Sequence, residues 1–257
     1  MLKRNLFLVL IGVFLAGCST VYNAATGHNE FIMVSTPEEV SMGKSAHQGV
    51  PQANTLSTDQ TVISRINTIG QRLARFSDRQ DYPYNFYVIE QDDLNAFTVP
   101  GGNVYIYSGL VKKLKTDDQI ASVLAHEIGH CAARHTIKKF QAALGYNLIG
   151  GLVLSALQVD SGTKQLAAMG SNTVMGLVFS AYGRQDEYQA DQLGVKYMAL
   201  AGYDPRGSIE ALEVLRNEMK NDRKVPLILR SHPYLEDRIE QVKKEIINLR
   251  VKYVKPS

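Results

Sequence analysis

One short motif near the middle of the chain, His126-Glu127-Ile128-Gly129-His130, limits the possible folds more than any other feature. Residues four apart on an α-helix lie on the same face, so His126 and His130 can offer two imidazole nitrogens to a single metal ion. Glu127 points about 100° around the helix from His126, away from the metal but close to a water bound to it. Two histidine ligands and a neighbouring general base are typical of zinc hydrolases.

The motif lies in a stretch with helical periodicity. Thr116 and Gln119 form a capping box, which predicts a helix start. From Ile120 the apolar residues keep a helical period as far as Phe140. The alternative is an ordinary helix whose two histidines are satisfied by hydrogen bonds. Buried imidazoles on such a face need partners, and a metal ion is a good one, so this context favours a metal site.

A catalytic zinc ion needs a third protein ligand and keeps its fourth position for water. The best candidate lies in Arg184-Gln185-Asp186-Glu187-Tyr188-Gln189-Ala190-Asp191. If this stretch is helical, Glu187 and Asp191 can face one site. One carboxylate can bind the metal while the other accepts a hydrogen bond from a ligand histidine and fixes its tautomer. Taken alone, these acids fit a solvated helix face; beside the HExxH motif they favour the metal site.

Three sequences in this order, HEIGH, RQDEYQAD and Ser231-His232-Pro233, resemble the gluzincin metallopeptidase family that includes the CAAX prenyl proteases and HtpX-type membrane proteases. The similarity covers the chain from about residue 30 to 245. It implies that Glu187 is the third zinc ligand and that Asp191 supports a ligand histidine. The chain lacks the series of transmembrane spans of the CAAX prenyl proteases, so their prenylated substrates do not carry over. It is more similar to soluble, periplasm-facing lipoprotein members.

Strand signals precede the HExxH motif. β-branched and aromatic residues predict a strand over residues 85–89. Two further runs, 95–99 and 104–107, flank a Pro-Gly-Gly-Asn turn and predict a hairpin. Together with the helical stretches, these strands predict a single α+β domain of zincin type, in which the HExxH helix packs on a small sheet.

The resemblance gives the hairpin a further role. In the family, the region corresponding to Asn95, Ala96 and Phe97 forms the sheet edge that borders the cleft. An exposed strand edge can hydrogen-bond an extended peptide main chain, which suits a peptidase. These three residues are therefore candidates for substrate contact, whereas the alternative is that they only fill the sheet.

His232 has more than one interpretation. A lone histidine before proline is commonly a loop residue. In the family that this chain resembles, the equivalent histidine approaches the zinc from the far side of the cleft, which makes His232 a candidate catalytic residue. It could stabilise the developing oxyanion or cap the zinc. A permanent fourth ligand would instead make the site structural and closed to water. Arg238 is a candidate for orienting this loop or joining the site.

The N-terminal segment predicts export and lipid anchoring. A positively charged start is followed by an apolar run from Leu6 to Leu15, which is too short to favour a spanning helix. Leu15-Ala16-Gly17-Cys18 reads as a lipobox, in which Cys18 becomes the lipidated N-terminus. The alternative is a plain secretory signal with a chance cysteine. Ser19 resembles the residue that favours outer-membrane sorting, with the protein facing the periplasm.

These signals divide the chain into three parts: a signal peptide over residues 1–17, a tether over 18–29 and a zinc metallopeptidase domain over 30–257. Removing the signal peptide lowers the formal net charge from +3 to +1, which does not indicate nucleic-acid binding. Cys131 becomes the only thiol, and we interpret it as a small core residue. The apolar stretches 144–159 and 173–179 are too short to span a membrane and could be core helices, a lid or a membrane contact.

The sequence therefore predicts an endopeptidase of the bacterial cell envelope with one zinc ion per chain. Its expected substrates are polypeptides, namely misfolded or unassembled envelope proteins, and its further partners are the membrane and the outer-membrane assembly machinery. The alternative is a lipoprotein that acts as a chaperone or adaptor in outer-membrane protein assembly with little proteolysis.

Overall fold

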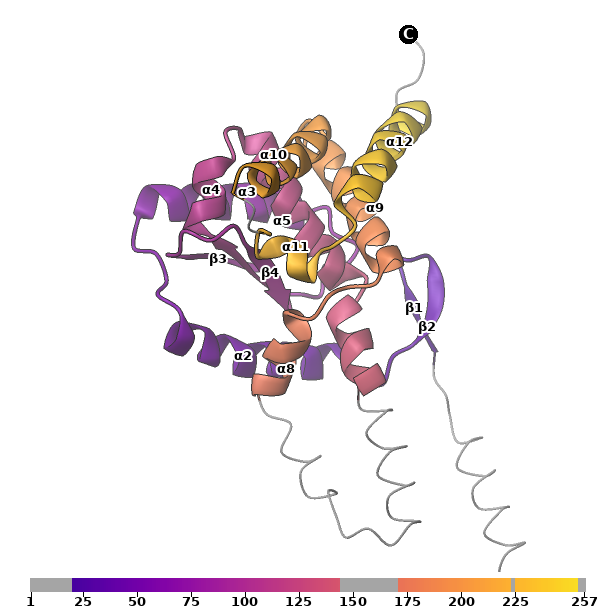
Figure 1. The fold of residues 1–257 in the computed structure, drawn as a ribbon. Helices are drawn as coiled ribbons and strands as arrows, with labels where there is room; N and C mark the ends of the chain where they lie inside the picture. Colours follow the sequence, from indigo (N-terminus) through magenta and orange to yellow (C-terminus); the bar gives the residue numbers. More distant parts are fainter. Residues whose placement is uncertain (1–19, 144–170, 223–224, 254–257) are drawn as a thin grey trace, which may run out of the picture.

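The computed structural model describes residues 20–143, 171–222 and 225–253, whose arrangement is shown in Figure 1. The expected signal peptide, Cys18 and the apolar stretch 144–159 lie outside the described residues. Within these ranges, no helix is long and apolar enough to cross a membrane. Helices and small sheets combine in an α+β fold, as the sequence predicts.

Helix α5, Asp117–Ala132, carries the HExxH motif through the interior. Its N-cap is Thr116, whose hydroxyl accepts a hydrogen bond from the Gln119 N–H at 3.2 Å. Every residue from Gln119 to Ala132 is buried, so the helix is enclosed on all sides rather than amphipathic. The other elements are arranged around it.

The predicted continuation of this helix to Phe140 is wrong. Helix α5 ends at Ala132 because Arg134 has a φ of 58°, a left-handed conformation in which an α-helix cannot continue. The Arg134 Nε lies 3.0 Å from Oε1 of the buried Glu39, an ion pair that holds this bend. A new helical stretch begins directly after it, over residues 135–143.

Three strands lie beside α5 in the order β3-β5-β4: β3 is Asn85–Ile89, β4 is Ala96–Val99 and β5 is Asn103–Tyr107. Strand β3 runs parallel to β5, and β4 runs antiparallel to it. The turn between β4 and β5 requires glycine, because Gly101 and Gly102 have φ values of +78° and +91°. The predicted strand and hairpin are confirmed, with β4 at an edge of the sheet.

Side chains alternate between two cores on opposite faces of this sheet. The first core contains strand residues such as Val88 and Ile106 together with apolar residues of α5 and of α3, Gln60–Ala74. The second contains Phe97 and Tyr105 together with residues of α2, Thr36–Ala53, and of α8, Ser171–Val178. In Figure 1, α2 and α8 accordingly lie below the sheet and α5 lies above it. The stretch 173–179 thus contributes to the core through Val178.

The remaining helices enclose α5: they are α4 (Ser108–Lys113), α9 (Arg184–Leu200), α10 (Arg206–Asp222), α11 (Ile228–Ser231) and α12 (Leu235–Tyr253). Helices α3, α9 and α10 pack directly on α5, and α12 packs against α9 and α10. The RQDEYQAD sequence is helical and lies against the HExxH helix, which meets the condition under which Glu187 and Asp191 can face one site.

The N-terminal end of the described chain is a hairpin of strands β1, Thr20–Asn23, and β2, His28–Phe31. Gly27, with a φ of +72°, lies in its turn. A tether was expected over residues 18–29; the structure instead has paired strands over residues 20–23 and 28–31. The buried residue of β1 is the polar Asn23, whereas its apolar residues are exposed, so apolar periodicity does not predict this hairpin.

Candidate active site

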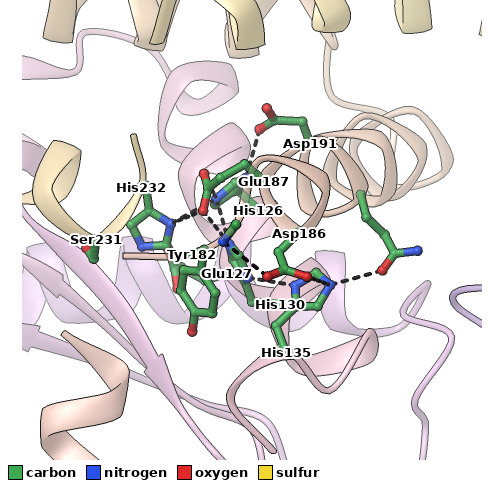
Figure 2. Close-up of polar contacts among 12 residues, drawn as sticks. His126, Glu127, His130, His135, Tyr182, Asp186, Glu187, Asp191, Ser231 and His232 are labelled. Atoms are coloured by element: carbon green, nitrogen blue, oxygen red, sulfur yellow. Dashed lines mark hydrogen bonds and ion pairs between the residues drawn. The ribbon is translucent and has the colours of Figure 1, made fainter. Parts of the chain in front are cut away.

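Four side chains from three parts of the chain meet beside the middle of α5 (Figure 2). His126 and His130 come from α5, Glu187 from the first turn of α9 and His232 from the residue that caps the end of α11. One imidazole nitrogen or carboxylate oxygen of each lies within 4.8 Å of the others, and all four residues are buried. These are metal-binding atoms, so the group can hold a metal ion.

Two glycines bring α5 and α9 close enough for this meeting. A Cβ at Gly129 would lie 2.8 Å from the carbonyl oxygen of Ala190, and a Cβ at Gly194 would lie 3.2 Å from the backbone nitrogen of His126. The two helix backbones are therefore in direct contact on both sides of the site. Larger residues at these positions would move Glu187 away from the histidines.

The distances among three of these residues fit a shared ion better than hydrogen bonds. The two Nε2 atoms of His126 and His130 are 3.0 Å apart. Oxygens of Glu187 lie 3.5 Å from the His126 Nε2 and 3.4 Å from the His130 Nε2. Glu187 Oε2 is buried and accepts no hydrogen bond. Two imidazole nitrogens and the two oxygens of one carboxylate thus lie around one point.

Asp191 and Arg238 contact His126 on the Nδ1 side of its ring. The ionised Asp191 Oδ1 accepts a hydrogen bond from the His126 Nδ1 at 2.8 Å, which leaves Nε2 free for a metal. Arg238 binds both Asp191 oxygens, from Nε at 2.8 Å and from Nη2 at 2.7 Å. Its Nη1 also lies 2.9 Å from the Glu187 Oε2. Arg238 therefore links the third candidate ligand to the support of the first.

Burial and neighbouring charges set the protonation of these groups. Burial lowers the pKa of His130 well below its usual value, which keeps the imidazole in the neutral form that binds metals. Burial raises the pKa of Glu187, but the charges of His232 and Arg238 outweigh it and lower the pKa well below the usual range. Burial and Arg238 lower the pKa of His126, yet Asp191 raises it to about 9. A metal ion would compete with that proton.

His130 has its own support, which comes partly from residues that sequence reasoning missed. The His130 Nδ1 lies 2.8 Å from the His135 Nδ1, and the His135 Nε2 lies 2.9 Å from the Gln189 Oε1. His135 lies outside the group that could hold a metal ion and supports His130 instead. Tyr182 stacks on the His130 ring at 4.0 Å between centroids. Gln189 lies inside the RQDEYQAD sequence, whereas no motif near Tyr182 predicts that it belongs to the site.

Glu127 lies beside this group without a hydrogen-bond partner. Its side chain is fully buried, and neither carboxylate oxygen accepts a hydrogen bond. The Nε2 of His232 is 3.5 Å from its Oε1. Burial raises the pKa of the Glu127 carboxyl. A carboxylate in this position is free to take a proton from a molecule placed next to the metal-binding group.

An apolar pocket opens next to Glu127, with a cavity volume of about 40 Å³. Glu127, His126, His232 and Arg238 stand at its polar end. Its apolar wall comes from α5, α10 and α11 and consists of Val123, Ala211, Leu212, Leu215 and Ile228. The pocket can take an apolar group of a molecule whose reacting atoms lie against the polar end.

Comparison with known protein families agrees with this geometry. A model of peptidase family M48 matches residues 62–246, more than half of the chain and a range that includes the whole metal-binding group. The chain belongs to peptidase family M48. The resemblance to gluzincin metallopeptidases noted from three short motifs is thereby confirmed.

Individual relatives of this M48 chain are moderately similar. The beta-barrel assembly-enhancing protease of Escherichia coli (strain K12) is 27% identical over 271 residues, covering 100% of this chain and 55% of that protein. The mitochondrial metalloendopeptidase OMA1 of Saccharomyces cerevisiae is 28% identical over 260 residues, covering 91% of this chain and 73% of that protein. The chain thus spans about half the length of the E. coli relative.

His232 lies closer to the metal-binding group of this M48 domain than a loop residue would. Its Nδ1 is 3.1 Å from the Glu187 Oε1 and 3.3 Å from the His126 Nε2. Its side chain is buried, and the backbone N–H bonds to the Ile228 carbonyl at 2.8 Å, which fixes the end of α11. The position allows both expected roles, contact with a reacting group and direct binding to the metal.

Asn95, Ala96 and Phe97 lie at the edge strand, and all three are buried. The Leu94 carbonyl accepts a hydrogen bond from the Ile228 N–H at 3.0 Å, which joins the start of β4 to the helix before His232. Phe97 stacks on Tyr105 and contacts Phe179 edge-on, so its side chain belongs to the second core. Any contact of this segment with substrate would therefore use the strand backbone.

Proposed function

We propose that this chain is a zinc-dependent endopeptidase. The observation that carries the proposal is the meeting of His126, His130 and Glu187 beside the unpartnered carboxylate of Glu127. Zinc bound at about 2.0–2.1 Å in a tetrahedron keeps its ligand atoms roughly 3.3 Å apart. The two histidine nitrogens are 3.0 Å apart, and each lies 3.4–3.5 Å from a different oxygen of the Glu187 carboxylate, so two imidazoles and one carboxylate are spaced as ligands of one zinc ion.

The chain's own residues would supply the proton transfers and the positioning. Zinc, when bound, acidifies water and polarises the scissile carbonyl. Glu127 would accept a proton from the attacking water and then deliver it to the leaving amine. Asp191 and Arg238 would hold His126 and Glu187 in their binding orientation, since they contact both. The apolar pocket would receive a substrate side chain next to the scissile bond.

His232 would act as a catalytic residue in this scheme. It lies 3.5 Å from Glu127 and lines the same pocket, and a donor there can stabilise a developing oxyanion. The same position could cap the metal. The competing assignment is a structural site in which four residues bind the metal permanently. That assignment does not explain the unpaired carboxylate of Glu127.

The proposed setting is the bacterial cell envelope. The lipobox ending at Cys18 supports a lipid anchor in the outer membrane facing the periplasm, after removal of residues 1–17. The peptidase domain would begin soon after it, with the β1-β2 hairpin replacing most of the expected tether. A relative named beta-barrel assembly-enhancing protease supports misfolded or unassembled envelope proteins as polypeptide substrates and the outer-membrane assembly machinery as a partner. A chaperone or adaptor with little proteolysis is the second candidate, favoured by the word "assembly" in that name.

The test is Glu127→Gln, with metal content and casein cleavage measured on the same sample. Removing only the proton acceptor should leave one zinc per chain and an intact fold while lowering cleavage by roughly two to four orders of magnitude. Unchanged cleavage by a zinc-loaded variant would contradict the mechanism. A wild-type chain that holds zinc, binds unfolded outer-membrane proteins and never cleaves them would favour the chaperone.

A further inference from the structure

The N-terminal hairpin exposes an unusual concentration of large apolar side chains. Val21, Tyr22, Phe31 and Met33 are 43%, 64%, 53% and 63% exposed. Among the described residues only nine large apolar side chains are exposed, and these four fall within residues 21–33. Concentrated exposed apolar groups mark a surface that contacts something else.

The register of the hairpin shows which way this surface points. Val21 pairs with Glu30, and Thr20 pairs with Phe31. The Glu30 carboxylate turns toward the domain, where it binds Lys138 Nζ at 2.7 Å. Side chains alternate between the faces of a strand pair, so Tyr22 and Phe31 share the opposite face, away from the domain. We call Tyr22, Phe31 and Met33 the hairpin patch.

The hairpin patch is part of a fixed element rather than of a loose tail. The Gln141 side chain accepts a hydrogen bond from the Met33 N–H at 2.6 Å and donates one to the Phe31 carbonyl at 3.1 Å. Ala25, in the turn of the hairpin, packs against the first core. The domain and the patch must therefore move together.

The sequence before the hairpin identifies the partner. Cys18, the proposed lipidation site, precedes Thr20 by two residues, and two residues of extended chain span at most about 7 Å. A lipid on Cys18 would therefore hold β1 at the membrane surface. Aromatic side chains such as tyrosine favour that interfacial region. We propose that the hairpin patch enters the lipid surface beside the acylated Cys18 and fixes the orientation of the peptidase domain.

This inference rests on the proposed lipid anchor and adds a second membrane contact to it. One anchor point alone would leave the domain free to swing, whereas two points define which side faces the bilayer. Figure 1 shows the hairpin at the right-hand edge of the molecule and α10, which contributes to the wall of the apolar pocket, at the top. A domain docked through the hairpin patch would keep that pocket away from the lipid and open to polypeptides in the periplasm.

The chain contains no tryptophan, so a single introduced tryptophan reports its own surroundings. We would make Tyr22→Trp in the full-length lipoprotein and reconstitute it in vesicles of phosphatidylethanolamine and phosphatidylglycerol, with or without bromine on the acyl chains. Ile247→Trp is the matched control, because Ile247 on α12 is 62% exposed, close to the 64% of Tyr22. The mass of the N-terminal peptide reports whether Cys18 carries lipid.

The expected result is strong bromine quenching and a blue-shifted emission for the tryptophan at position 22, with neither at position 247. Adding Phe31→Glu to the Tyr22→Trp chain should remove most of the quenching while the protein stays in the vesicles. A lipidated protein with equal quenching at both positions, or none, would overturn the proposal. A blue shift without quenching would assign the patch to a protein partner or a second copy and also overturn it. Quenching without lipid on Cys18 would support the hairpin contact and refute the anchor.

Discussion

Glu187 and Asp186 are neighbours in α9 with opposite surroundings, which makes them a direct test at the scale of single residues. Glu187 is fully buried between the two histidines, whereas the Asp186 side chain is 39% exposed and accepts a hydrogen bond from the Gly183 N–H at 3.2 Å. Glu187→Ala should lose most of the bound zinc and all casein cleavage, because two histidines cannot complete a catalytic tetrahedron. Metal content by mass spectrometry of the native protein checks this.

Asp186→Ala is the control for that experiment. It removes one carboxylate from the same helix turn and a helix cap worth about 1 kcal/mol, but no candidate ligand. Zinc content and cleavage should therefore stay near wild type. If Glu187→Ala holds zinc as tightly as wild type, or if Asp186→Ala loses it, the third ligand is misassigned.

The sequence predicts those parts of the site that depend on local spacing. His126 and His130, and likewise Glu187 and Asp191, lie one helical turn apart, so a helix brings each pair to one face. The sequence makes Arg238 a candidate but does not predict its partners, because its contacts with Asp191 join residues 47 apart. No local periodicity encodes such a contact.

At the scale of elements, the crossing of α5 over α9 depends on Gly129. A Cβ there would lie 2.8 Å from one Ala190 backbone atom and 3.1 Å from another, and backbone cannot yield as a flexible side chain does. Gly129→Ala should therefore push the helices apart, cost about 1–3 kcal/mol in the free energy of unfolding, and weaken zinc binding as Glu187 withdraws. Urea unfolding and a chelator competition measure the two effects.

Gly176→Ala on α8 is the matched control, because a Cβ there meets nothing within 4 Å. It should raise the free energy of unfolding by about 0.5–1 kcal/mol, since alanine loses less backbone entropy than glycine in a helix. Zinc affinity should not change. A Gly129→Ala protein that matches this control in stability and zinc affinity would show that the backbone contact does not set the site.

Helices and strands that follow from apolar periodicity could be predicted from the sequence. Features that depend on a contact between residues distant in the sequence could not. The strand over residues 85–89 follows from its β-branched residues, and the hairpin over residues 96–107 follows from its Gly-Gly turn. The end of α5 depends on Arg134, whose ion pair with Glu39 links positions 95 apart in the sequence. The apolar residues beyond Ala132 still keep a helical period, so that pattern alone could not show the bend.

On the scale of the whole molecule, the candidate metal site joins three segments that pack around α5, namely α9, α11 and α12. Its donors come from α5, α9 and the end of α11, and Arg238 adds α12. Buried charges of opposite sign therefore hold together segments that apolar packing brings near. A metal ion that binds all of them at once should stabilise the folded chain well beyond the site itself.

Metal removal tests that coupling. Zinc present at about 1,000 times its dissociation constant stabilises a folded protein by about 4 kcal/mol. For a chain of about this length each kcal/mol shifts the melting temperature by roughly 2–4 °C, so a chelator should lower it by roughly 8–16 °C. Glu127→Gln should show the same drop, because Glu127 is outside the donor set, whereas Glu187→Ala should start from the lower temperature and hardly respond. A wild-type melting temperature that chelation leaves unchanged would mean that apolar packing alone holds α5, α9 and α11 together, with the metal serving only the chemistry.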